Sequence, residues 1–234
     1  MNIDFCKYTN IGGRTNNEDS IAVFRQDSGI LCVVADGLGG HDNGEIASGI
    51  AVKTLHEQVF GKLSEDILRA ALDEANRGVC EAAAGSNMKT TVAALWFDKD
   101  GILAANVGDS RIYQFRAGKI IYQSVDHSLA QLDMIAGDVS FSDVRNNPDR
   151  NKLIRVVGMQ NGFKSDVEKL TCQKGDAFLL CSDGFWENIL EAEILKCLKN
   201  AASAKQWLTE MCRLLTQRLN EDSDNNSAIA VLVK

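Results

Sequence analysis

The chain has 234 residues, of which 45% are hydrophobic and 24% are charged, and its formal net charge is −7. This composition is typical of a globular protein that is long enough to bury a sizeable core. The negative charge disfavours nonspecific binding to nucleic acid or to an anionic membrane, and no apolar segment approaches the roughly 18 residues of a transmembrane helix.

The N-terminal segment, the cysteines and the single proline predict a cytoplasmic protein of one domain. We see no basic segment followed by an apolar one at the start, as a secretory signal peptide would have. The seven cysteines are odd in number and form no Cys-x-x-Cys pair, which favours reduced thiols over a disulfide framework. One proline and no Pro- or Ser-rich linker indicate a single domain over residues 1–234.

The first half of the chain contains predicted strands, then helices, then hairpins. Short apolar segments at about 3–10, 20–25 and 31–35 predict three strands. Two amphipathic segments predict helices, one with Ala47, Ile50, Ala51 and Leu55 on one face and one with Ile67, Leu68, Ala71, Leu72, Ala75 and Val79. Two hairpins follow, 91–97 with 102–107 and 112–116 with 119–124, each around a turn that contains glycine.

The second half begins with an irregular polar segment, about 128–150, which we interpret as a loop or flap. Strands are predicted near 153–158, 166–171 and 177–181, followed by two helices and a last strand at 228–233. The last helix places Trp207, Leu208, Met211, Leu215 and Leu219 on one face. Helix pairs separated from hairpin-connected strands predict an α+β fold, most simply a four-layer αββα sandwich of two antiparallel sheets flanked by helix pairs.

Three of the apolar segments end in an aspartate beside a glycine. These ends are Asp36-Gly37, Gly108-Asp109 and Asp183-Gly184. Carboxylates that crowd together without compensation are unfavourable, so their convergence would imply a bound cation. If the three strand ends meet in space, they form a metal site.

Three polar segments have more than one interpretation. Glu18 and Asp19 are adjacent, so they would serve different partners if extended, or belong to a solvated loop. The glycine-rich segment 36–45 lacks the Gly-Lys-Ser/Thr of a phosphate-binding loop. Segment 222–227 starts like a calcium-binding loop, but Ser227 and Val233 stand where glycine and glutamate belong. It is either a helix-ending turn or a carboxylate that enters the last strand.

Eight motifs occur in one order along the chain and carry a family resemblance. They are Arg14-x-x-x-Glu18-Asp19, the segment 34–41 around Asp36-Gly37, Thr90-Thr91, the segment 106–111 around Asp109, Asp126-His127-Ser128, the segment 153–158, Cys181-Ser182-Asp183-Gly184 and Asp224-Asn225. In this order they resemble the metal-dependent protein phosphatases of type 2C, in the compact bacterial form. The resemblance spans nearly the whole chain, from Arg14 to Asp224.

The resemblance implies a pair of Mg²⁺ or Mn²⁺ ions, with a possible third, in a cleft at one end of the sandwich. It implies that Asp36 bridges two ions, that Asp183 and Asp224 complete one, and that Glu18 and the Gly37 carbonyl serve the other. Asp19 would orient bound water, Asp109 with Asp183 would hold the third ion, and Arg14 would clamp the substrate phosphate. Oxygen ligands suit both metals, and arginine suits phosphate.

The implied activity is hydrolysis of phosphoserine and phosphothreonine in proteins by a metal-activated water, which would reverse a Ser/Thr kinase. Phosphorylated proteins would be the partners, and we expect a monomer. One alternative is a catalytically silent relative that binds phosphoproteins, and another is an unrelated β-sandwich with a structural metal. Retention of Asp36, Asp183 and Asp224 favours the enzyme.

The sequence departs from the family pattern at a few positions. Leu38 stands where eukaryotic relatives carry a histidine that is thought to protonate the leaving group, so His41 or solvent would take that role. His127 is expected to order the segment that follows it, and His56 to lie on the surface of a helix. Lys89 replaces the first residue of the usual Gly-Thr-Thr, which affects local backbone geometry more than chemistry.

Overall fold

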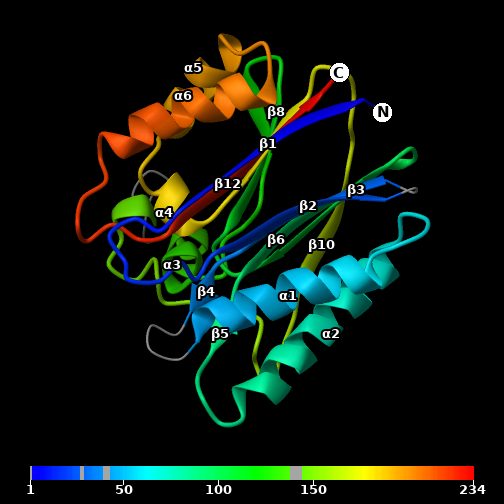
Figure 1. Cartoon of the computed structure of the whole chain (residues 1–234), viewed down its shortest axis with the longest axis vertical. Coiled ribbons are helices and arrows are strands. Elements are labelled where there is room, and N and C mark those ends of the chain that lie inside the picture. The colour runs from blue at the N-terminus through cyan, green and yellow to red at the C-terminus, as the bar shows by residue number, and fades with distance from the viewer. Residues whose placement is uncertain (1, 27–28, 39–42, 138–143) are drawn as a thin grey trace.

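The computed structural model describes residues 2–26, 29–38, 43–137 and 144–234 and contains two five-stranded antiparallel sheets with helices outside them (Figure 1). In chain order the elements are β1 (Ile3–Asn10), β2 (Ser20–Gln26), β3 (Gly29–Ala35), β4 (Gly37–Leu38), α1 (Gly44–Gln58), α2 (Glu65–Ala83), β5 (Lys89–Thr90), β6 (Val92–Asp98), β7 (Gly101–Val107), β8 (Arg111–Arg116), β9 (Lys119–Gln123), α3 (Leu129–Ala136), the 3-10 turn η1 (Val144–Asn146), β10 (Asp166–Leu170), β11 (Ala177–Cys181), α4 (Asp183–Trp186), α5 (Glu191–Lys199), α6 (Ala204–Thr216) and β12 (Asn226–Val233).

The two sheets pack face to face. The first has the strand order β1-β12-β11-β8-β9 and the second has β10-β7-β6-β3-β2. Apolar side chains of both sheets fill the space between them, and Phe97 of β6 meets Phe178 of β11 edge to face at 5.4 Å. All residues of β6 are buried, since this central strand is covered on one side by the first sheet and on the other by helices.

Each sheet carries helices on its outer face, which completes four layers (Figure 1). The predicted apolar face of α1 and α2 packs on the second sheet, and that of α6 packs on the first, where Trp207 meets Phe115 at 5.5 Å. Serine hydroxyls accept hydrogen bonds at two helix starts, Ser64 from the Ile67 amide and Ser203 from the Gln206 amide. The predicted αββα sandwich is confirmed.

The strand predicted at 153–158 is wrong. This segment makes only isolated bridges, between Ser128 and Leu153 and between Thr90 and Val157. Its amide groups bond to different neighbours: Ile154 donates to the His127 carbonyl and Val157 to the Thr90 carbonyl. A ladder needs one continuous partner strand, and here the partners belong to separate parts of the chain.

The prediction of an irregular segment at 128–150 holds only in part. Residues 129–136 form α3, whose start is capped by the Ser128 hydroxyl, which accepts from the Gln131 amide at 3.3 Å. A serine followed by an apolar segment is a helix-start signal that the interpretation as a loop overlooked. Residues 138–143 lie outside the described residues. The short ribbon of β4 with β5, and helix α4, were also not predicted.

No helix in the described ranges combines the length and apolar character needed to cross a bilayer.

Candidate metal centre

The three aspartates at predicted strand ends meet at one end of the sandwich. Strands β3 and β7 both pair antiparallel with β6, so they run in the same direction and finish at the same edge. Asp36 follows β3 and Asp109 follows β7, while Asp183 follows β11 of the other sheet. Asp36 and Asp183 are joined by a hydrogen bond, and the charge of Asp183 acts on both other carboxyl groups.

Burial and mutual repulsion raise the pKa values of these carboxyl groups. Burial is the main cause that raises the pKa of Asp36 and of Asp109 well above the usual range, and the negative charge of Asp183 is the next. Burial also raises the pKa of Asp183 to about 7, with further contributions from Glu187 and Asp224. The side-chain interaction between them raises the pKa of Asp36 and lowers that of Asp183. Such a cluster of carboxyl groups favours a cation.

A cleft of about 290 Å³ opens beside these carboxyl groups, and we call it the acidic cleft. It is lined by Arg14, Thr15, Asn16, Glu18, Asp36, Gly37, Leu38, Asp183, Asp224 and Asn225. It therefore brings together residues from both ends of the chain and from both sheets. Of the predicted site residues, Asp19 and Asp109 do not line the cleft.

Glycine lets the backbones around the cleft approach one another closely. A Cβ atom at Gly37 would lie 2.3 Å from the carbonyl oxygen of Gly44, and one at Gly184 would lie 2.1 Å from that of Asn225. Both distances are far below van der Waals contact, so neither position accepts a side chain without a shift of the neighbouring backbone. The glycine after Asp36 and the glycine after Asp183 are thus steric requirements of the cleft.

Arg14 and Asp224, for which separate roles were predicted, bind each other. The guanidinium donates from Nε to Oδ1 at 3.0 Å and from Nη2 to Oδ2 at 2.8 Å. This side-on pair is half exposed, with 56% of the Arg14 side chain and 45% of the Asp224 side chain accessible. Asp224 thus precedes β12 as a carboxylate that enters the last strand, and of the two interpretations of segment 222–227 this one is correct.

Glu18 is anchored by its backbone at the start of helix α1. Its amide donates to the side chain of Asn225 at 2.7 Å, and its carbonyl accepts from the Ser48 hydroxyl at 2.6 Å and from the Gly37 amide at 3.2 Å. Its carboxylate lies against the first residue of α1, since a Cβ atom at Gly44 would be 2.4 Å from Oε2. An anionic side chain is favoured at the N-terminus of a helix.

Asp19 points the other way from Glu18, into the protein. Its Oδ2 accepts a hydrogen bond from the Ser182 hydroxyl at 2.9 Å, directly beside Asp183. Its Oδ1 is buried and has no partner within the described ranges. Burial raises the pKa of Asp19 to about 6, although the hydroxyl groups of Ser227 and Ser182 lower it. A buried carboxylate oxygen without a donor is suited to contact a water or a cation.

A layer of buried side chains behind the cleft fixes the backbone of Asp109. The indole Nε1 of Trp186 donates to the Asp109 carbonyl at 2.9 Å, and the Gly108 amide donates to Nδ1 of His127 at 3.1 Å. Trp186 belongs to α4, which begins with Asp183, so this bond ties two of the aspartate loops together. His127 therefore orders the Gly108-Asp109 turn, and its carbonyl accepts a hydrogen bond from the amide of Ile154, far along the chain. That it orders the segment directly after it stays a prediction.

Arg111 completes this layer. Its guanidinium lies 3.4 Å from the ring centre of Trp186 and forms a buried ion pair with Asp126, from Nη2 to Oδ2 at 2.7 Å. Sequence reasoning quoted Arg111 and Asp126 as motif residues without a role, and it missed Trp186. The available signal was an indole three residues after the strand-end Asp183, on the first turn of a helix.

The residues of the acidic cleft fit divalent cations in chemistry. The donors are carboxylates and a carbonyl, which Mg²⁺ and Mn²⁺ prefer, and Asp19 offers an unpartnered oxygen. No group of three or more His, Cys, Asp or Glu side chains in the described part of the chain is arranged to hold a metal ion. Asp224 is turned to Arg14, with which it forms an ion pair. The predicted ligand set therefore stays a prediction.

The histidines do not supply a proton donor to the cleft within the described residues. His127 is buried behind the Asp109 turn, and His56 lies exposed on α1, stacked on Phe24 at 3.8 Å. His41 falls outside the described residues.

Comparison with known proteins gives one consistent result. The family model described as Protein phosphatase 2C matches residues 8–223. The serine/threonine phosphatase stp of Listeria welshimeri is 30% identical over 233 residues, which cover 94% of this chain and 91% of that protein. The structure of the S. agalactiae serine/threonine phosphatase superposes with a TM-score of 0.89 at 28% identity and covers 100% of both chains. The catalytic domain of PstP in complex with two manganese ions has the same fold, with a TM-score of 0.83 at 23% identity and 99% of both chains covered.

Proposed function

The chain belongs to the protein phosphatase 2C family, and we propose that it is a metal-dependent phosphatase of phosphoserine and phosphothreonine in proteins. The observation that carries this proposal is the acidic cleft, in which Asp36, Asp183 and Asp224 gather beside Arg14. The family match covers most of the chain, and a relative of similar length bears the name serine/threonine phosphatase.

The carboxylates of the cleft would hold the cations. We assign Asp36, Asp183 and Asp224 to this role together with Glu18 and the carbonyl of Gly37, and we place Asp109 and Asp19 behind them. Bound Mg²⁺ or Mn²⁺ supplies a water of lowered pKa and neutralises charge on the phosphoryl oxygens. For this the carboxyl groups must release the protons that burial makes them keep, so activity should rise with pH across the range in which Asp19 and Asp183 titrate.

Arg14 is the group that would bind the substrate phosphate. Its guanidinium faces the cleft and presents a planar pair of donors, which the phosphate oxygens match. Its pair with Asp224 is half exposed, and exposed ion pairs contribute little stability, so Arg14 can leave Asp224 at small cost. We propose that Arg14 turns from Asp224 to the phosphate when Asp224 takes part in cation binding.

The direct test is hydrolysis of a phosphothreonine peptide by the purified protein. We expect turnover with Mn²⁺ or Mg²⁺ and its loss with a chelator. Asp36→Asn and Asp183→Asn should each reduce kcat/KM by at least two orders of magnitude, because each removes an anionic oxygen at the centre of the cleft. Asp149→Asn, at a partly exposed carboxylate that forms an ion pair with Lys152, is the matched control.

Turnover by Asp36→Asn at the wild-type rate would refute the assignment of a paired metal centre. A wild-type protein that binds phosphopeptide without turnover would instead favour a catalytically silent relative. We further propose phosphorylated proteins as substrates, a monomeric state and a place in the cytoplasm. A comparison of the phosphoproteome with and without the gene would identify the substrates.

A further inference from the structure

A second hollow lies on the outer side of the first sheet, and we call it the α5 cavity. It has a volume of about 600 Å³ and lies between α5, the β8–β9 turn and the end of β12. Its floor is apolar: Phe115 is buried, and Leu195, Leu198 and Leu232 are half-buried. Small-molecule sites are typically concave, roughly 300–1,000 Å³ in volume and lined mostly by apolar side chains with a few polar groups.

The α5 cavity is separate from the acidic cleft. Strand β11 begins in the cavity at Ala177 and ends at Cys181, immediately before the residues of the acidic cleft. Strand β12 runs the other way, from Asn226 near the cleft to Val233 in the cavity. The two hollows therefore lie at opposite ends of the same strands, so a ligand of one does not touch the other.

Cations surround the apolar floor. Arg116, Lys196, Lys199 and Lys234 line the cavity. Lys196 and Lys199 are three residues apart on α5, so they share a face of the helix. Both are exposed, and neither has an ion-pair partner anywhere in the described part of the chain. In a chain with a net charge of −7, two unpaired cations at the rim of an apolar hollow are a local excess of positive charge.

The carboxylate in the lining does not cancel this excess. Asp176 is fully enclosed and takes two hydrogen bonds from Arg116, at 2.7 Å each. The side chain of Gln114 and the amide of Gln173 donate to it as well, both at 3.0 Å. Asp176 is thus compensated by Arg116, and Lys234 is paired with Asp4 at 2.8 Å. The charge left for a ligand is that of Lys196 and Lys199.

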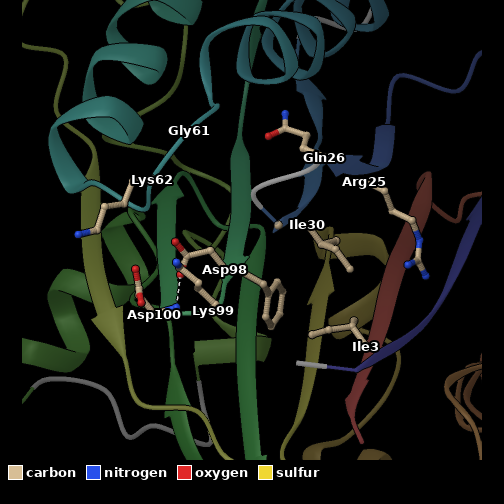
Figure 2. A pocket seen from close by; sticks show the side chains of 11 residues that line it. Ile3, Arg25, Gln26, Ile30, Gly61, Lys62, Asp98, Lys99 and Asp100 are labelled. Carbon is tan, nitrogen blue, oxygen red and sulfur yellow. Dashed lines mark hydrogen bonds between the residues drawn. The ribbon is translucent and has the colours of Figure 1, made fainter.

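A larger hollow at the same end of the molecule differs from the α5 cavity in the charges of its lining. That cavity, of about 670 Å³, is drawn in Figure 2 and carries both Arg25, Lys62 and Lys99 and the carboxylates of Asp98 and Asp100. Its lining thus carries charges of both signs, and the Asp98 carboxylate accepts hydrogen bonds from the amides of Leu63 and Asp100. Of these two hollows in the described part of the chain, the α5 cavity is the one that combines an apolar floor with exposed, unpaired lysines.

We propose that the α5 cavity binds an amphipathic anion, a small molecule with an apolar body and one carboxylate or sulfonate group. The apolar body would cover Leu195, Leu198 and Leu232, and its burial would supply most of the affinity. The anionic group would lie between Lys196 and Lys199, at the rim where it keeps partial contact with water. Nothing in this proposal depends on the chemistry of the acidic cleft.

The test uses two probes on the full chain, dodecanoate below its micelle concentration and 8-anilinonaphthalene-1-sulfonate. Isothermal titration calorimetry should show saturable binding with one site. Lys196→Glu/Lys199→Glu should weaken it at least tenfold, because the anionic group then meets two carboxylates. Lys164→Glu/Lys169→Glu makes the same charge change at two exposed residues, one just before β10 and one in it, and should stay within twofold of the wild type. Dodecyltrimethylammonium, with the same chain and the opposite charge, should bind at least tenfold more weakly than dodecanoate.

A second variant tests the cavity independently of charge. Ala192 lines the cavity and is exposed, so Ala192→Phe should fill the hollow without disturbing the core and should weaken both probes at least tenfold. If this variant does not fold, as judged by circular dichroism, the lysine pair alone decides. Absence of saturable binding of either probe, equal binding by the lysine pair variant and its control, or equal binding of the cationic amphiphile would overturn the proposal.

Discussion

The buried ion pair behind the acidic cleft yields the most quantitative prediction. Arg111 and Asp126 have only 5% and 2% of their side chains exposed, and Nε and Nη2 of Arg111 both donate to the carboxylate, at 3.0 and 2.7 Å. Arg111→Met keeps much of the aliphatic volume but leaves the Asp126 carboxylate buried without its cation. Removal of one partner of such a pair costs about 3–5 kcal/mol of unfolding free energy.

The assay is urea unfolding of the wild type, of Arg111→Met and of Arg111→Met/Asp126→Asn. The double variant should recover part of the lost stability, because the remaining amide is neutral and its desolvation costs less than that of a carboxylate. Arg213→Met is the control, since its ion pair with Glu210 is exposed and should contribute at most about 1 kcal/mol.

Activity provides a second measure of the same variant. The Arg111 guanidinium stacks on Trp186, whose indole holds the Asp109 carbonyl, so Arg111→Met should also lower kcat/KM in a folded sample. A loss of less than about 1 kcal/mol in Arg111→Met, equal to that of Arg213→Met, would refute the view that this pair is desolvated and coupled.

Three further predictions concern the cleft itself. Folding raises the pKa of Asp19 to about 6 and that of Asp183 to about 7, so in chelator the protonated groups contribute stability that is fully present below pH 3.8. This contribution is lost as the pH rises through 6–7. Mn²⁺ should therefore raise the melting temperature more at pH 8 than at pH 5. An equal metal effect at both values would contradict this. Gly184→Ala should cost about 1–3 kcal/mol in urea unfolding and most of the activity, since its Cβ would meet the Asn225 carbonyl; a wild-type unfolding midpoint would count against it. Arg14→Ala should raise KM with a smaller change in kcat, and an unchanged KM would remove Arg14 from phosphate binding.

The amino-acid sequence was sufficient to predict most elements and the layer order. Short apolar segments, hairpin turns and amphipathic faces are local properties of the sequence. They were therefore sufficient to predict β6 and β7, the helices α1 and α2, and the apolar face of α6. The sequence alone failed for 153–158, whose amide groups bond to several distant segments. The tertiary structure decides which segments lie beside residues 153–158, so no local sequence pattern predicts these hydrogen bonds.

The candidate site, like the fold, was predicted from the sequence only in part. The pattern of an apolar segment that ends in an aspartate named Asp36, Asp109 and Asp183, and the family resemblance carried by the ordered motifs implied roles for Asp224, Glu18 and Arg14. Only the tertiary structure decided that Arg14 pairs with Asp224, that Asp183 lies beside Asp36, and that Trp186 holds the Asp109 turn. These contacts join residues far apart in the chain. The shifted pKa of Asp36 and the buried Trp186 bond also depend on the exclusion of water, which exists only once the two sheets have packed.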